Sequence, residues 1–409
     1  MDMAKPIIRF KGYQDDWEQR KLGELAEIVG GGTPSTSVDS YWDGDIDWYA
    51  PAEIGEQIYL KSSQRKITEE GLNKSSAKVL PVGTVLFTSR AGIGKTAILL
   101  KEGCTNQGFQ SIVPNKDKLD SYFIFTRSEE LKRYGEIVGA GSTFVEVSGK
   151  QMANMELMMP TTMDEQQKIG GYFSNLDHLI TLHQRKCDET KRLKKYMLQK
   201  MFPQNGEKVP EIRFSGFTDD WEQRKSGEIA PLRGGFAFKS NEYSPDGVPI
   251  VRISNILSDG SVGSDFAYYG EQNSDDMYAL YDGAVVLAMS GATTGKISVL
   301  HTKKGQKYYQ NQRVGYFTPT DSCDYGFIKT IMRSQLFAEQ LSSVLVAGAQ
   351  PNVSSREIDG FEFMIPKSKD EQQKIGVYFS KLDHLITLHQ RELENLQNIK
   401  RFMLGKMFV

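Results

Sequence analysis

The chain has 409 residues, which exceeds the size of a single hydrophobic core and predicts two or more domains. Hydrophobic residues make up 39% and charged residues 25% of the sequence, a composition typical of a folded soluble protein and unlike that of a disordered one. The net charge of −2 excludes a global attraction to nucleic acid, so DNA binding would require locally clustered lysines and arginines.

Targeting and redox signals are absent from the sequence. No apolar run approaches 18 residues, and the first residues, MDMAKPIIRF, lack the apolar core of a signal peptide. The three cysteines are odd in number and far apart, so they form no metal or disulfide pattern. We therefore expect a cytoplasmic protein.

The chain opens with a motif that it repeats. Residues 8–26 read IRFKGYQDDWEQRKLGELA, and residues 212–230 read IRFSGFTDDWEQRKSGEIA, with 14 of 19 positions identical. The repeat predicts two tandem units of about 205 residues that pack about a pseudo-two-fold axis. The alternative is a duplication that only enlarges the protein. The nearly unchanged frames and divergent interiors argue against that alternative.

The interiors between the repeated motifs have one outline. The first, about 27–163, contains a glycine-rich turn (IVGGGTPSTS), short strands (DIDWYAPAEI and KVLPVGTVLFTS), a helix (SYFIFTRSEELKRYGEI) and a closing strand (MELMMP). The second, about 231–369, keeps this order with different side chains, from RGGFAFKS to FEFMIP. We predict two α+β domains of one fold, which suggests two versions of one reading module.

A second repeated stretch predicts a long helix in each unit. Residues 164–185 recur at 370–391 with two differences, Gly171 against Val377 and Asn175 against Lys381. Apolar residues recur every three or four positions, so each helix of about 35 residues, roughly 50 Å, carries one apolar stripe. We expect the two helices to pair antiparallel as a coiled coil. The predicted interface residues are Ile169, Phe173, Leu176, Leu179, Ile180, His183, Ile375, Phe379, Leu382, Leu385, Ile386 and His389.

These elements predict five segments. The first α+β domain with its opening motif spans 1–163, the first helix 164–202, a polar linker 203–211, the second α+β domain 212–369 and the second helix 370–409.

The combination of motifs resembles a known family. The DEQQKI helix start, the GGTPS…YW…G.I.W turn and strand, the Asn-Gln pair and the two-fold repeat are similar to those of specificity subunits of type I restriction–modification systems. The resemblance covers essentially the whole chain. It implies that each variable region is a target recognition domain for one half of a bipartite DNA site, and that the chain itself is not an enzyme.

The resemblance also implies partners and their cofactors. Two modification subunits would bind S-adenosylmethionine and methylate adenine in double-stranded DNA. Restriction subunits would use ATP and Mg. This chain would bind no cofactor or metal.

Polar and cationic side chains on the predicted loops are candidates for DNA contact, because such groups read base edges and phosphates. They are Ser89, Arg90, Lys95, Asn106, Gln107, Gln110, Arg252, Asn255, Ser290, Thr293, Lys296, Asn311, Gln312, Arg313, Gln350 and Asn352. Each could instead be a solvated or turn-capping residue. The recurrence of Asn106-Gln107 as Asn311-Gln312 favours a role in the shared fold for these pairs.

Other functions remain as alternatives. SRAGIGKT resembles a phosphate-binding loop, but Ser89 replaces the first glycine of that motif. The helix histidines are five residues apart, whereas zinc on one helix face needs a spacing of four. No catalytic set recurs in both units. A two-domain interaction scaffold without DNA binding is the main alternative, and a nucleoside-triphosphatase is a distant third.

Overall fold

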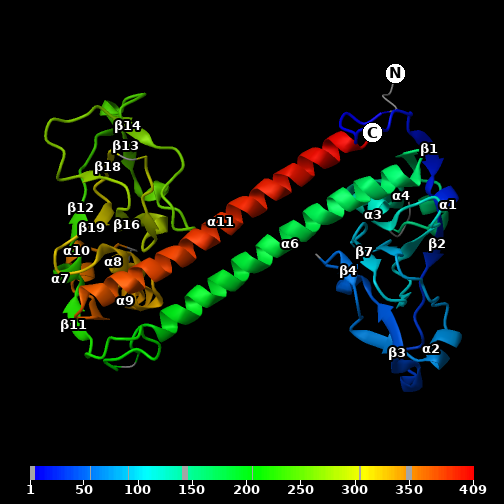
Figure 1. Ribbon diagram of the computed structural model, residues 1–409, viewed down its shortest axis with the longest axis horizontal. Coiled ribbons are helices and arrows are strands. Elements are labelled where there is room, and N and C mark those ends of the chain that lie inside the picture. Colours follow the sequence, from blue (N-terminus) through cyan, green and yellow to red (C-terminus); the bar gives the residue numbers. More distant parts are fainter. Residues whose placement is uncertain are drawn as a thin grey trace. The chain divides into compact units, whose positions relative to one another are not determined.

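The computed structural model describes residues 5–55, 57–90, 92–140, 146–204, 206–303, 305–346 and 352–409. The chain forms two compact units. Unit 1 comprises Met1–Gln184 and Arg391–Val409, and unit 2 comprises Arg185–Gln390 (Figure 1). Over the described ranges, no helix is both long and apolar enough to cross a membrane.

Unit 1 is an α+β domain whose described strands form two larger sheets and one two-stranded sheet. Within the described residues its strands are β1 (Glu18–Lys21), β2 (Ala26–Gly30), β3 (Trp42–Tyr49), β4 (Tyr59–Leu60), β5 (Arg65–Ile67), β6 (Val85–Phe87), β7 (Thr96–Leu99), β8 (Cys104–Thr105), β9 (Gln110–Pro114) and β10 (Glu156–Met159). The sheets have the orders β2-β9-β6-β7-β4 and β5-β3-β8, and β1 pairs with β10. The helices are α1 (Leu22–Leu25), α2 (Glu69–Asn73), α3 (Ser121–Thr126), α4 (Ser128–Gly139), α5 (Gly149–Ala153) and the start of α6 (Met163–Lys200).

Unit 2 repeats this plan. Its described strands are β11 (Glu222–Lys225), β12 (Leu232–Gly234), β13 (Val248–Val251), β14 (Ala267–Tyr269), β15 (Ala279–Leu280), β16 (Val285–Ala288), β17 (Ile297–Val299), β18 (Tyr308–Gln310), β19 (Val314–Phe317) and β20 (Glu362–Ile365). The sheets have the orders β12-β19-β16-β17 and β14-β13-β18-β15, and β11 pairs with β20. The helices are α7 (Ser226–Ile229), α8 (Tyr325–Met332), α9 (Gln335–Val346), α10 (Ser355–Asp359) and the start of α11 (Lys369–Met407).

Strand pairing shows that the two units share one fold. β3 runs parallel to β8 through the pair Tyr49–Thr105, and β13 runs parallel to β18 through the equivalent pair Val251–Gln310. β6 and β16 are buried along their whole length, because neighbouring elements cover both faces of each strand. The predicted pair of α+β domains is therefore confirmed.

The repeated motifs meet each other inside each unit. In unit 1 the guanidinium of Arg9 donates to both carboxylate oxygens of Glu165 at 2.6 and 2.8 Å, and Glu165 is 1% exposed. In unit 2 Arg213 donates to Glu371 in the same way at 2.7 and 2.8 Å. The Glu165 carboxylate raises the pKa of Arg9 through this hydrogen bond. The repeated sequence thus forms the frame of each domain.

The start of each long helix also anchors the interior. Gln166 of α6 accepts a hydrogen bond from the backbone N–H of Asp120, the residue that caps α3, and Gln372 of α11 does the same for Asp324, which caps α8. A Cβ on Gly170 would lie 2.6 Å from the Asp120 carboxylate. Glycine is required there because α6 and the start of α3 approach so closely.

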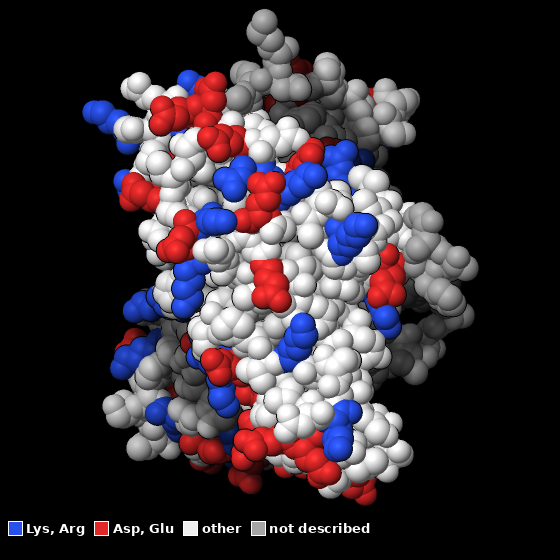
Figure 2. Space-filling model, turned by 90° about the vertical axis from the view of Figure 1, so that its right-hand side faces the viewer, with Lys and Arg blue, Asp and Glu red and all other residues white. Residues whose placement is uncertain are grey.

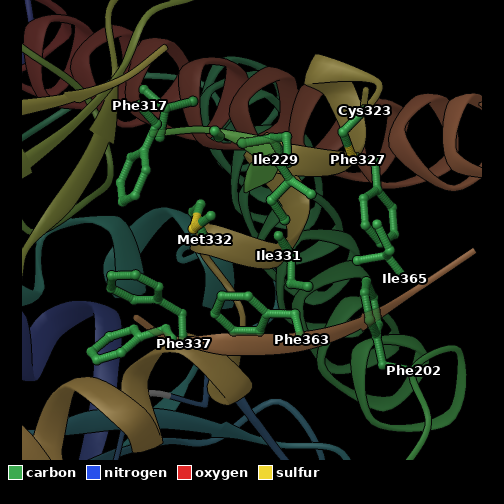
Figure 3. Close-up of a cluster of buried hydrophobic side chains, with 14 of the residues drawn as sticks. Phe202, Ile229, Phe317, Cys323, Phe327, Ile331, Met332, Phe337, Phe363 and Ile365 are labelled. Atoms are coloured by element: carbon green, nitrogen blue, oxygen red, sulfur yellow. The ribbon is translucent and has the colours of Figure 1, made fainter. Parts of the chain in front are cut away.

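Within each unit the two long helices pair antiparallel. The unit 1 core contains Ile169 and Phe173 of α6 together with Met407 of α11, and Phe408 packs against it. In unit 2, Ile375 and Phe379 of α11 share a core with Phe202, which follows α6. The ring of Phe202 stacks on Phe327 at 5.7 Å (Figure 3). The end of each helix thus completes the core begun by the start of the other.

In each unit an aspartate of one long helix pairs with a lysine of the other. Asp177 of α6 accepts from Lys400 of α11 at 2.6 Å and from the Tyr122 hydroxyl at 2.8 Å. Asp383 of α11 accepts from Lys194 of α6 at 2.5 Å and also pairs with Arg333, the residue that follows α8. Sliding one helix along the other would separate these charged groups, so the ion pairs favour the observed register.

The predicted helix interface is only partly buried. The side chains that enter the cores are Ile169, Phe173, Leu176, Ile375, Phe379 and Leu382. Ile180, His183, Ile386 and His389 are half-buried. Leu179 and Leu385 are 40% and 41% exposed, so the prediction of buried interface positions was wrong for them. The stripe is narrower than the sequence pattern suggested.

We expect Asp177→Asn to destabilise unit 1 by about 2 kcal/mol, because an amide leaves the partly buried Lys400 ammonium without its counter-charge. Denaturant unfolding of the full chain measures the change. The unit 2 counterpart, Asp383→Asn, should cost less, because Asp383 is 32% exposed and Asp177 only 7%. A smaller loss for Asp177→Asn than for Asp383→Asn would contradict this account of the alignment.

Candidate nucleic-acid interface

Three loops and one helix-leading segment come together in unit 1. The Tyr49 carbonyl at the end of β3 accepts from Asn106 in the β8–β9 turn at 3.0 Å. Ser89 in the β6–β7 turn donates to Gly108 at 2.8 Å and accepts from Val147, just before α5, at 2.9 Å. We call these segments, residues 49–53, 88–90, 92–95, 106–108 and 146–148, loop cluster 1.

Unit 2 has the same arrangement. The Val251 carbonyl at the end of β13 accepts from Asn311 at 3.0 Å. Met289 donates to the Arg313 carbonyl at 3.0 Å and accepts from Val353 at 2.9 Å. Residues 251–255, 288–296, 311–313 and 352–354 form loop cluster 2. Apart from Gln110 and Gln350, the candidate residues named from the sequence therefore fall within one loop cluster per unit.

Loop cluster 1 presents several polar side chains to solvent. Arg90, Lys95 and Gln107 are exposed, and Arg90 forms an ion pair with Glu146 at 2.9 Å. Arg90 and Lys95 line an open cavity of about 770 Å³ between the β6–β7 turn and α4, together with Lys132 of α4. The exposed groups can donate to phosphate oxygens or to acceptors on base edges.

Loop cluster 2 presents a different set. Gln312, Arg313 and Asn352 are exposed, while Ser290 and Lys296 are half-buried. Ser290 and Asn352 form an isolated β-bridge, which connects the segment after β16 to the segment before α10. Arg313 occupies the position of Gly108, so the equivalent turns carry different chemistry.

Two nominated residues are buried, and their proposed DNA contacts were wrong. Ser89 is 0% exposed, and its backbone carries the hydrogen bonds that join loop cluster 1. Asn255 is 1% exposed. Its amide donates to the Gly263 and Asp265 carbonyls at 2.9 and 3.3 Å and accepts from the Arg252 backbone at 3.0 Å. Both residues stabilise the loops from inside.

Several nominated side chains already bond to neighbouring backbone. Asn106 accepts from the Gly108 N–H at 2.7 Å, and the Thr293 hydroxyl donates to the Ile253 carbonyl at 3.1 Å. Arg252 donates to the Asp265 carbonyl at 2.7 Å. These contacts are those of turn-capping residues.

The remaining candidate residues differ in how exposed they are. Gln107 accepts a hydrogen bond from Thr33, which partly uses its amide. Gln110 and Asn311 are half-buried. Gln350 lies outside the described residues.

A glycine that recurs in both units lets the backbone lie directly against the β8–β9 turn in unit 1 and the β18–β19 turn in unit 2. A Cβ on Gly31 would lie 2.0 Å from the Asn106 carbonyl oxygen, and one on Gly235 would lie 2.3 Å from that of Asn311. Any larger residue would push the turn away. The two glycines therefore allow the close backbone contact that holds each turn in place.

The turn containing Lys95 uses its own polar groups. The Lys95 N–H donates to the Thr88 hydroxyl at 3.0 Å, that hydroxyl donates to the Gly92 carbonyl at 2.7 Å, and the Gly94 N–H donates to the Thr88 carbonyl at 3.0 Å. A nucleotide-binding loop needs such N–H groups free for phosphate. The geometry argues against a nucleotide site here.

Charge on the surface is mixed. Figure 2 shows a face of unit 1 on which lysines and arginines are interspersed with aspartates and glutamates. This face is therefore not uniformly basic. Across the described ranges, no group of three histidine, cysteine, aspartate or glutamate residues is arranged to hold a metal ion.

Sequence reasoning missed two residues beside the loop clusters. Lys132 of α4 lines the cavity with Lys95, but α4 reads as an ordinary amphipathic helix. Phe236 is an exposed aromatic that neighbours Asn311. The one available signal was its place in RGGFAFKS, where the first unit has a threonine- and serine-rich stretch.

Measurements of stability in the absence of DNA should distinguish the buried, structural residues among the DNA-contact candidates from the exposed ones. We expect Asn255→Ala to lower the free energy of unfolding of unit 2 by about 2 kcal/mol, because buried backbone partners lose their hydrogen bonds. Arg313→Ala should change it by no more than about 0.5 kcal/mol, because the side chain is exposed. Equal losses in a denaturant titration would contradict the assignment.

The sequence matches known proteins over most of its length. Residues 14–192 and 218–398 match the family model described as the type I restriction modification DNA specificity domain. The type I restriction enzyme MjaIX specificity subunit of Methanocaldococcus jannaschii is 31% identical over 59% of this chain and 58% of that protein. The MjaVIII specificity subunit of the same organism is 22% identical over 95% of this chain and 91% of that protein.

A solved structure has the same fold. The S subunit of a type I restriction–modification system from M. genitalium superimposes with a TM-score of 0.68 and 14% sequence identity, covering 99% of both chains. The two copies of the domain found by sequence coincide with the two loop-bearing units. The chain therefore belongs to the family of type I restriction–modification DNA specificity proteins.

Proposed function

We propose that this chain is the non-catalytic DNA-recognition subunit of a type I restriction–modification complex, in which each unit reads one half of a bipartite site. The observation that carries the proposal is the pair of loop clusters. They have the same backbone hydrogen bonds but different exposed side chains. Two domains that recognise different DNA sequences require the same backbone scaffold with different side chains at the DNA-contacting positions.

The exposed residues suggest how reading would occur. Arg313 has the forked donors that suit guanine O6 and N7, and Gln312 has the donor and acceptor that suit adenine N6 and N7. In unit 1, Lys95 and Lys132 suit phosphate contact, which positions a reader without specifying sequence. The buried Ser89 and Asn255 would act only by shaping the loops.

Partner docking is the second part of the proposal. Unit 1 exposes Leu179 and Leu182 of α6, and unit 2 exposes the equivalent Leu385 and Leu388 of α11. Exposed apolar side chains that recur at equivalent helix positions suit two copies of one partner. We infer that they contact two modification subunits.

The chemistry would belong to those partners. S-adenosylmethionine would bind to the modification subunits, and ATP and Mg would bind to restriction subunits. The complex would act in the cytoplasm. Because α6 and α11 each contribute residues to both units, we propose that their length sets the unread gap between the half-sites.

DNA binding at several salt concentrations tests the function. We expect weak sequence-specific binding by the chain alone and much tighter binding with the modification subunit, and the affinity should fall steeply as salt rises because phosphate contacts release counterions. Arg313→Ala should weaken cognate binding by about 10- to 100-fold. Salt-independent or absent DNA binding in the assembled complex would instead favour an interaction scaffold.

A matched variant separates docking from reading. Leu179→Asp combined with Leu385→Asp should remove the gain in affinity given by the modification subunit. The binding of the chain alone should be unchanged, because neither leucine belongs to a loop cluster.

A further inference from the structure

An aromatic side chain stands exposed beside loop cluster 2. Phe236 is 46% exposed, whereas its aromatic neighbours Phe238 and Tyr278 are 8% exposed each. Its ring stacks on that of Tyr278 with centroids 4.9 Å apart and an angle of 30° between the planes, and it meets Phe238 edge-on at 5.0 Å. Buried rings thus hold Phe236 in place while part of it faces solvent.

Backbone contacts place Phe236 next to the reading turn. Its N–H donates to the Gln310 carbonyl at 2.9 Å, and it forms a parallel bridge with Asn311. The Gln310 amide donates to the Arg233 and Val314 carbonyls at 2.7 and 2.6 Å, which fixes both strands. The backbone of Phe236 therefore neighbours the turn that carries Gln312 and Arg313.

Unit 1 lacks this ring. Gly32 donates to the Thr105 carbonyl at 2.8 Å, which is the hydrogen bond that Phe236 makes to Gln310 in unit 2. The equivalent position beside loop cluster 1 is a glycine and thus carries no side chain. Any contact made by Phe236 distinguishes the two units.

We propose that Phe236 contacts the 5-methyl group of a thymine in the half-site read by unit 2. The proposal rests on the DNA-reading function proposed above. Tyr278 covers one face of the ring, so Phe236 cannot insert between base pairs with both faces stacked. Its free part can make the apolar contact by which phenylalanine recognises the thymine methyl in the major groove. The amide and guanidinium on the adjacent turn suit the polar edges of neighbouring bases.

Thymine-to-deoxyuridine replacement tests this contact, because it removes only the methyl group. The full chain, assembled with its modification subunit, is titrated with duplexes in which the thymines of the mapped site are replaced one at a time. We expect about a fourfold loss of affinity at one or two thymines of a single half-site, the size of one lost methyl contact. Phe236→Ala should weaken binding to the normal duplex and remove this sensitivity.

Tyr281→Ala is the matched control, because Tyr281 is an exposed aromatic before β16, at the end of that strand away from Ser290. This variant should keep the sensitivity to deoxyuridine. Phe236→Leu should keep part of it, and unchanged unfolding midpoints show that both phenylalanine variants are folded.

Two results would contradict the thymine contact and leave the proposed DNA-reading function intact. One is equal sensitivity to deoxyuridine in the native protein and Phe236→Ala. The other is a site in which no thymine replacement changes the affinity. Absence of any sequence-specific binding overturns the proposed function itself.

Discussion

Replacing Glu165 with glutamine is expected to lower the free energy of unfolding of unit 1 by about 3 kcal/mol. Glu165 is 1% exposed and holds the guanidinium of Arg9 through two hydrogen bonds. An amide would leave the arginine charge without its counter-charge and would place an N–H₂ donor against another donor. A buried pair broken on one side loses far more stability than a surface pair does.

Matched variants make this prediction specific. Glu371→Gln removes the equivalent pair with Arg213 and should have a similar effect on unit 2. Glu24→Gln should have little effect, because the ion pair of Glu24 with Arg20 is exposed. Denaturant unfolding followed by tryptophan fluorescence reports both units, since Trp17 and Trp221 lie in their cores. A native-like midpoint for Glu165→Gln would show that this pair does not hold the frame together.

Replacing the interior of unit 2, residues 231–369, with that of unit 1, residues 27–163, is expected to change the DNA target without unfolding the protein. The exchanged segments begin after equivalent residues, Ala230 in unit 2 and Ala26 in unit 1. They also end at equivalent residues, Lys369 and Met163. The side chain opposite Asp383 changes from Arg333 to Tyr122, an arrangement that unit 1 already has with Asp177.

The effect on binding should be large. Affinity for the native site should fall on the order of a thousandfold, because several mismatched base pairs cost about 1–3 kcal/mol each. Affinity should rise to a similar degree for a duplex that holds two copies of the half-site read by unit 1. Competition binding with the two duplexes measures both changes. A chimera that is folded and still prefers the native site would mean that the interiors do not carry specificity.

The repeats allowed most of the architecture to be predicted from the sequence. Near-identical frames around divergent interiors predicted two α+β domains of one fold, and the apolar spacing predicted two long helices. The contribution of Phe202 and Phe408 to cores formed mainly by distant segments was not predicted, because single residues beyond a helix carry no periodic signal.

The loop clusters were predictable only in part. Sequence placed Asn255 and Gln312 in loops as equally polar residues, but one is buried and the other exposed. That difference arises from tertiary contacts such as the amide bonds of Asn255 to Gly263 and Asp265. Phe236 was missed for the opposite reason, because an aromatic residue is normally assigned to the core.

The spacing of apolar residues also overstated the helix interface. Leu179 and Leu385 fit the pattern of three and four but lie at its margin and remain exposed. Periodicity shows which residues share a side of a helix, and the position of the neighbouring elements decides how wide the buried stripe is.

The most direct test of the account is the pattern of adenine methylation in DNA from cells that carry this chain with its modification subunit, compared with cells that carry Arg313→Ala. The account predicts a two-part motif with a fixed gap that disappears without the chain. It predicts that Arg313→Ala relaxes one half of the motif and leaves the other half unchanged. A single contiguous motif, or a change in both halves from this one substitution, would contradict the assignment of one half-site to each unit.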